Sequence, residues 1–215
     1  LAVSALLASC SESELWQNPQ TEARDGYIML NFKTEIPAMQ EVVTRAVDPD
    51  GGGVQDMTLF CFDSYGLFIS TVKAGVTVQK PGPGEMEGTF KAEVPENTRT
   101  IHFLANQNMD EFKEDSFRNK SESEVMAVLE GSSGRMIYWG RFACDAGNDS
   151  NIAEQMATSG NSVKLIRNHA RISVDNPDNN GHIVITGFAV CNTNAFGTVA
   201  PHHPKKGFDF TWPSS

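Results

Sequence analysis

The sequence lacks the features that would assign it to several common functional classes. Its 215 residues contain only four cysteines and no CxxC pair, so neither a zinc site nor a complete disulfide framework is indicated. Cys61, Cys144 and Cys191 leave two alternatives open, one disulfide with one free thiol or three buried thiols. Basic residues are outnumbered, with 17 Lys and Arg against 27 Asp and Glu. The net charge of −10 argues against nucleic acid as a partner, because Lys and Arg would have to neutralise its phosphates.

Motifs that carry catalytic or ligand chemistry are missing as well. The hydrolase elbow G-x-S-x-G is absent, and no G-x-G-x-x-G or phosphate-binding loop connects a strand to a helix. Of the five histidines only His202 and His203 are close, and neighbouring side chains of an extended chain point opposite ways, which disfavours chelation. We therefore predict that the chain is not an enzyme, with no catalytic residue, no metal ion and no cofactor.

A long apolar run is also lacking, although the chain opens with a short one, LAVSALLAS, that leads to Cys10. Nine residues are too few to cross a bilayer, which takes about 20. The sequence Leu7-Ala8-Ser9-Cys10 resembles the lipobox of bacterial lipoproteins, in which the Cys becomes the new N-terminus and carries acyl chains. The alternative is a secretory signal in which the Cys is a coincidence. The acidic residues 11–14 resemble the signal that exports Bacteroidetes lipoproteins to the outer face of the outer membrane.

The first strong structural signal is DGYIMLNFKTEIP at residues 25–37. Apolar Ile28, Leu30 and Phe32 alternate with other residues, and this period of two predicts a half-buried strand that an Asp-Gly turn opens. A hairpin follows from residue 57 to residue 72, and further strands are expected at residues 89–95, 99–107, 135–144, 161–176 and 181–192. Strands at such spacing, separated by Gly and Pro, predict an all-β sandwich.

One helix interrupts the strands. Ser121 and Glu124 have the spacing of a capping box, an apolar stripe follows, and Gly131 is placed to end the helix. Its short length predicts a crossover that lies on one sheet.

Carbohydrate binding would require an exposed aromatic platform, for which the three tryptophans are candidates. Trp16 lies in the polar segment before the first strand, and Trp212 lies in the aperiodic tail. Trp139 falls within an apolar strand, where core packing is the favoured role. The sequence therefore shows no such platform.

Taken in order, these features resemble the N-terminal half of the Bacteroidetes fimbrillins, the lipoprotein precursors of type V pilus subunits. The resemblance covers roughly residues 7–201. It is carried by the lipobox Cys, the first strand and the segments TRA, TLFCFDSYGLFI, IHFLAN, MIYWG, KLIRNHARISV and GFAVCNTNAFGTVAP.

The resemblance implies a transthyretin-like, Greek-key β-sandwich of about seven or more strands with one short crossover helix. It divides the chain into a lipoprotein signal remnant (1–10), a flexible tether (11–24), the fimbrillin N-terminal domain (25–200) and a linker toward a C-terminal domain (201–215). It also implies a location in the outer membrane and fimbrium, attachment to the membrane through a lipid on Cys10, and other fimbrial subunits as partners. Ligands on host or bacterial surfaces are further expected partners.

Fimbrillins mature by a trypsin-like cut after an arginine in the loop that follows the first strand. The resemblance places this cut between Arg45 and Ala46, which would separate the strand of Ile28, Leu30 and Phe32 from the sandwich. A strand from another subunit would then fill the exposed groove. The alternative is that Arg45 is an ordinary solvated loop residue. Shaft, tip and anchor roles stay open, and a surface lipoprotein that binds glycan or protein ligands without polymerising is the alternative function.

Overall fold

The computed structural model describes residues 23–36, 54–81, 86–131, 136–168, 186, 187, 189, 191, 197–202, 207 and 208. Within these residues the chain forms nine strands, two α-helices and a short 3-10 helix at Glu114–Phe117. Most of the strand predicted at residues 181–192 and the second half of the one predicted at 161–176 lie outside the described residues.

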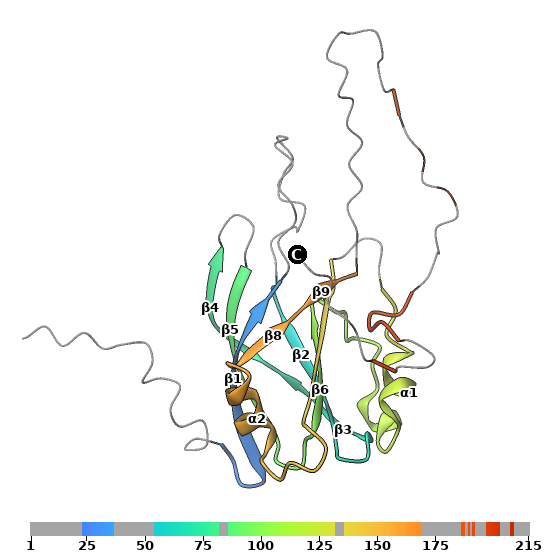
Figure 1. Cartoon of the computed structure of the whole chain (residues 1–215). Helices are drawn as coiled ribbons and strands as arrows, with labels where there is room; N and C mark the ends of the chain where they lie inside the picture. The colour runs from blue at the N-terminus through green and yellow to red at the C-terminus, as the bar shows by residue number, and fades with distance from the viewer. Residues whose placement is uncertain are drawn as a thin grey trace, which may run out of the picture.

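The strands form two sheets that face each other (Figure 1). Sheet A has the order β4-β5-β1-β8, made of β4 (Gly75–Pro81), β5 (Met86–Pro95), β1 (Tyr27–Glu35) and β8 (Ser162–Lys164). Sheet B has the order β3-β2-β6-β7-β9, made of β3 (Phe68–Lys73), β2 (Met57–Phe62), β6 (Thr100–Ala105), β7 (Tyr138–Ala143) and β9 (Ile166–Arg167). All neighbouring strands are antiparallel except β1 and β8, which are parallel. This confirms the predicted all-β sandwich, whereas its Greek-key connection stays a prediction.

The main core lies between the sheets. Alternate residues of the strands face inward, as the period of two requires. They include Leu30 and Phe90 from sheet A and Leu59 and Phe103 from sheet B, all of which are buried.

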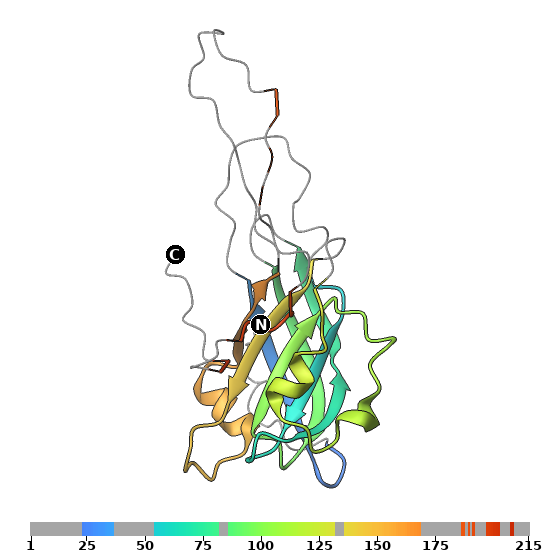
Figure 2. The same ribbon diagram turned by 90° about the vertical axis from the view of Figure 1, so that its right-hand side faces the viewer.

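A second apolar layer covers the outer face of sheet B. Phe60, Phe62 and Leu104 point away from the main core, yet they are buried under α1 (Glu122–Met126) and the residues around it. Figure 2 shows α1 lying over the strands of sheet B, as predicted for a crossover helix on one sheet. Because both faces of sheet B are covered, β2 and β6 are buried along their whole length.

Helix α1 begins as the sequence predicts but ends earlier. The capping box is present, with the Ser121 hydroxyl accepting from the Glu124 amide and the Glu124 carboxylate accepting from the Ser121 amide. The helix stops at Met126, five residues before Gly131, because the chain there leaves the helix and pairs with residues 197–199. The Gly131 amide donates to the Gly197 carbonyl in this pairing.

The prediction of a single helix was incomplete. A second helix, α2 (Ile152–Thr158), has its own capping box between Asn151 and Glu154. Its apolar side chains, Ile152 and Met156 among them, are buried in the core between the sheets. The helix therefore closes the sandwich beside β1 (Figure 1).

Residues 161–167, the first part of the single strand predicted at residues 161–176, instead form two strands. The chain pairs with β1 through β8, passes Leu165, and then pairs with β7 through β9, so it moves from sheet A to sheet B. Gly140 of β7 permits this close passage, because a Cβ atom there would lie 2.6 Å from the Lys164 carbonyl oxygen. Among the described residues, no helix is long and apolar enough to span a membrane.

Candidate functional site

Strand β1, the predicted exchangeable strand, lies inside sheet A and not at its edge. It pairs with β5 in antiparallel register from Tyr27 opposite Pro95 to Thr34 opposite Gly88. On its other side it pairs in parallel with β8, from Lys33 opposite Ser162 to Glu35 opposite Lys164. Removal of β1 would therefore open a gap between two strands that remain attached to the rest of the domain.

The three predicted groove-filling side chains of β1 are buried in the main core. Ile28 and Leu30 are 7% and 2% exposed, and Phe32 is fully buried. Phe32 stacks on Phe90 of the same sheet, with 5.5 Å between ring centroids, and meets the edge of Phe103 of sheet B at 5.0 Å. A single side chain of β1 thus connects both sheets.

The other face of β1 is mostly open, as the alternating pattern predicts. Tyr27 and Lys33 are exposed and Asn31 is half-buried. Met29 departs from the pattern because it is only 7% exposed.

The remaining predicted site residues, Cys10, Arg45 and Ala46, lie outside the described residues. Trp16 and Trp212 lie outside them as well. Trp139 is 2% exposed, which confirms its predicted place in a core.

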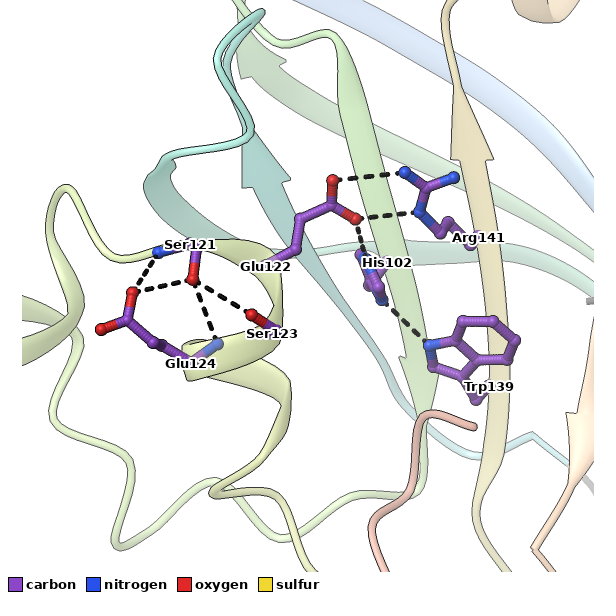
Figure 3. A network of polar contacts seen from close by, with 7 residues as sticks. All are labelled: His102, Ser121, Glu122, Ser123, Glu124, Trp139 and Arg141. Carbon is purple, nitrogen blue, oxygen red and sulfur yellow. Dashed lines mark hydrogen bonds and ion pairs between the residues drawn. The ribbon is translucent and has the colours of Figure 1, made fainter. Parts of the chain in front are cut away.

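A polar network that the sequence did not predict lies between α1 and sheet B (Figure 3). The Glu122 carboxylate on α1 accepts hydrogen bonds from His102 Nε2 of β6 at 2.8 Å and from Arg141 of β7. Arg141 donates through Nε at 2.9 Å and through Nη2 at 3.2 Å, a two-pronged ion pair. Trp139 Nε1 donates to His102 Nδ1 at 3.0 Å.

These contacts fix the protonation of the network. Since the indole N–H of Trp139 can only donate, His102 Nδ1 must accept and its proton stays on Nε2, facing Glu122. Burial lowers the pKa of His102, which keeps the ring neutral. Burial raises the pKa of Glu122, but the hydrogen bonds from His102 and Arg141 outweigh it and lower this pKa to about 2. Glu122 and Arg141 are therefore a charged pair beside a neutral imidazole.

The sequence contains little that could have revealed this network. His102 lies in the apolar run of β6, and its partners come from two other segments that only the strand register and the docking of α1 bring together. Within the part of the chain that the structure describes, no three His, Cys, Asp or Glu side chains gather as metal ligands would.

All three of the described cysteines have free thiols. Cys61 is buried, Cys144 is half-buried and Cys191 is exposed, so both sequence-based alternatives were wrong. Burial raises the pKa of the Cys61 thiol to about 12. The thiol of Cys61 is therefore protonated in the folded chain.

No family model, curated protein or solved structure matches this chain.

Proposed function

We propose that this chain is a non-enzymatic subunit of a cell-surface fimbria of the fimbrillin type. In this proposal the chain is exported as a lipoprotein acylated at Cys10 and reaches the outer membrane. Cleavage after Arg45 then releases the first strand, and a strand of another subunit replaces it. The observation that supports the proposal is the position of β1, an interior strand whose apolar side chains fill the core and which is the first strand among the described residues.

The energetics favour replacement once β1 has left. Burial of an aliphatic or aromatic side chain contributes about 1.5 to 3 kcal/mol, so Ile28, Leu30 and Phe32 together contribute roughly 5 to 9 kcal/mol. The unpaired backbone groups of β5 and β8 would add a further cost if they stayed buried without partners. A groove of this kind binds a strand with alternating apolar residues by β-strand addition.

The segment that joins β1 to β2 contains the proposed cut. Arg45 follows β1 in the sequence and precedes Val54, which is buried in the main core. A cut there divides the chain between the first strand and the rest of the fold. The residues C-terminal to the cut contain every strand of sheet B and the other strands of sheet A.

Limited digestion of the folded chain with an Arg-specific protease tests the proposal. We expect a cut after Arg45 that mass spectrometry identifies, and its loss in the Arg45→Lys variant, which keeps the charge but not the recognised residue. The cut protein should bind an added synthetic peptide of residues 25–36, measured by fluorescence anisotropy of a labelled peptide. A matched peptide with Leu30→Asp should not bind, because a carboxylate would enter the apolar groove.

Two outcomes would contradict strand exchange. One is resistance of Arg45 while other arginines are cut. The other is a cut protein, freed of its first strand, that binds both peptides equally or neither. With the native donor segment present, the cut subunits should also form a ladder of oligomers that resists denaturant on a gel.

The alternative, a surface lipoprotein that binds a ligand without polymerising, is favoured by a different observation. An open pocket lies beside the exposed ring of Tyr65, on the outer side of sheet B and away from β1. The two functions do not exclude each other, since they would use different surfaces.

A further inference from the structure

The pocket beside α1 has a volume of about 510 Å³. It is bounded by the turn between β2 and β3, by the start of α1, by β7 and by residues near the end of the described chain. Its lining includes Tyr65, Glu122, Ser123, Arg141, His202 and Phe208.

Aromatic rings form part of the wall. The Tyr65 residue is 86% exposed, and its backbone is held because the Asp63 carboxylate accepts from the amides of Tyr65 at 2.8 Å and Leu67 at 2.9 Å. Phe208 packs edge-on against His102, with 4.7 Å between ring centroids. Tyr65 therefore offers an accessible ring on a hydrogen-bonded turn, while the ring of Phe208 is held by its contact with His102.

Among the described residues, Arg141 and Glu122 in the pocket lining have hydrogen-bonding capacity that no contact uses. A guanidinium has five N–H donors, and the contacts of Arg141 with Glu122 use only two of its nitrogens, Nε and Nη2. The Glu122 Oε1 atom accepts one hydrogen bond at 3.2 Å, and a carboxylate oxygen has two lone pairs. A donor and an acceptor thus lie side by side, and Ser123, whose hydroxyl contacts that of Ser121 at 3.2 Å, lines the same pocket.

Charge decides which class of ligand fits. Glu122 is ionised and neutralises Arg141, so an anionic ligand would gain little from Arg141 and would be repelled by Glu122. A cationic ligand would gain little from Glu122, whose charge Arg141 neutralises, and would be repelled by Arg141. An uncharged ligand with adjacent hydroxyls is repelled by neither Glu122 nor Arg141. Its hydroxyls can accept from the guanidinium and donate to the carboxylate.

We propose that this pocket binds one neutral pyranose ring of a glycan, with the sugar C–H face on Tyr65 and adjacent hydroxyls on the Glu122–Arg141 pair. The inference stands apart from strand exchange, because none of these residues belongs to β1 or to the segment that carries Arg45. It would give a polymerising subunit a weak site that gains avidity through repetition.

Saturation-transfer NMR with the full chain tests the proposal. The probes are the methyl glycosides of mannose, galactose and glucose, with N-acetylneuraminic acid as an anionic sugar and glucosamine as a cationic one. We expect at least one neutral glycoside to bind with a dissociation constant on the order of millimolar. The Tyr65→Ala variant should weaken that binding about three- to tenfold, which corresponds to the loss of one aromatic contact.

Two variants serve as controls. Tyr65→Phe keeps the ring and should retain the affinity, whereas Tyr27→Ala removes an exposed ring on β1 and should leave binding unchanged. The proposal would be overturned if no neutral glycoside binds, if Tyr65→Ala binds as the parent chain does, or if a charged sugar binds more tightly than the neutral ones. Cleavage after Arg45 should not alter the affinity, so failure of this site and failure of strand exchange give different results.

Discussion

Replacement of Phe32 by alanine probes how much of the fold depends on β1. The ring of Phe32 is fully buried, stacks on Phe90 at 5.5 Å and meets Phe103 edge-on at 5.0 Å. Truncation removes its burial and both ring contacts, and it leaves a cavity between the sheets. Phe→Ala substitutions of this kind cost about 3 to 5 kcal/mol, a large share of the roughly 5 to 15 kcal/mol that stabilises a typical domain.

Urea unfolding, followed by far-UV circular dichroism, measures this loss. We expect the midpoint to fall markedly while the slope of the free energy against urea stays unchanged, since the same surface is exposed on unfolding. Asn31→Ala is the matched control, because Asn31 neighbours Phe32 in the sequence and is a half-buried residue on the other, mostly open face of β1. Its free energy of unfolding should change by no more than about 0.5 kcal/mol.

Equal effects of the two substitutions would refute the reasoning. So would a cost below about 1 kcal/mol for Phe32→Ala, because β1 would then contribute little to the core. In that case its loss would leave no groove that a second strand could stabilise, and the proposal of strand exchange would lose its physical basis.

Three further predictions concern other parts of the fold. Gly140→Ala should destabilise the domain by about 1 to 3 kcal/mol in the same urea assay, because its Cβ atom would lie 2.6 Å from the Lys164 carbonyl oxygen. The Cys61 thiol should react with a maleimide only after denaturation, since it is buried and its pKa is raised to about 12, and mass spectrometry of labelled peptides would detect earlier labelling. Acid should weaken the fold in two stages in melting experiments across pH. Because the pKa of His102 is lowered in the folded chain, the unfolded chain takes up a proton at this residue first. The folded state therefore loses stability as the pH falls below 6.5. The lowered pKa of Glu122 removes more stability between pH 4.5 and about 2, and a melting temperature constant from pH 8 to pH 3 would contradict both effects.

Local patterns predicted the elements whose signals lie within a few residues. The alternation of Ile28, Leu30 and Phe32 identified β1, and the spacing of Ser121 and Glu124 identified the start of α1. Helix α2 carried the same kind of signal, since Asn151 and Glu154 also form a capping box, but it was not recognised. Strand β4 was missed as well, and it lies next to β5 at the edge of sheet A.

Packing between residues far apart in the sequence determines where some elements end, and local patterns did not predict these ends. Residues 161–167 have the composition of one strand, but Leu165 marks the point where the chain passes from β1 to β7, and only the neighbouring strands define that point. The end of α1 at Met126 likewise depends on residues 197–199, which pair with the chain beyond the helix.

The amino-acid sequence by itself determined the all-β class, the half-buried first strand and the capping of α1, because hydrophobic period and capping act between residues close in the chain. The tertiary structure alone decided that β1 is an interior strand and that Glu122, His102, Arg141 and Trp139 meet. Those four residues come from three segments, and their contacts depend on strand register and on the docking of α1 over sheet B. Such placement results from burial of the whole apolar surface, which no local pattern encodes.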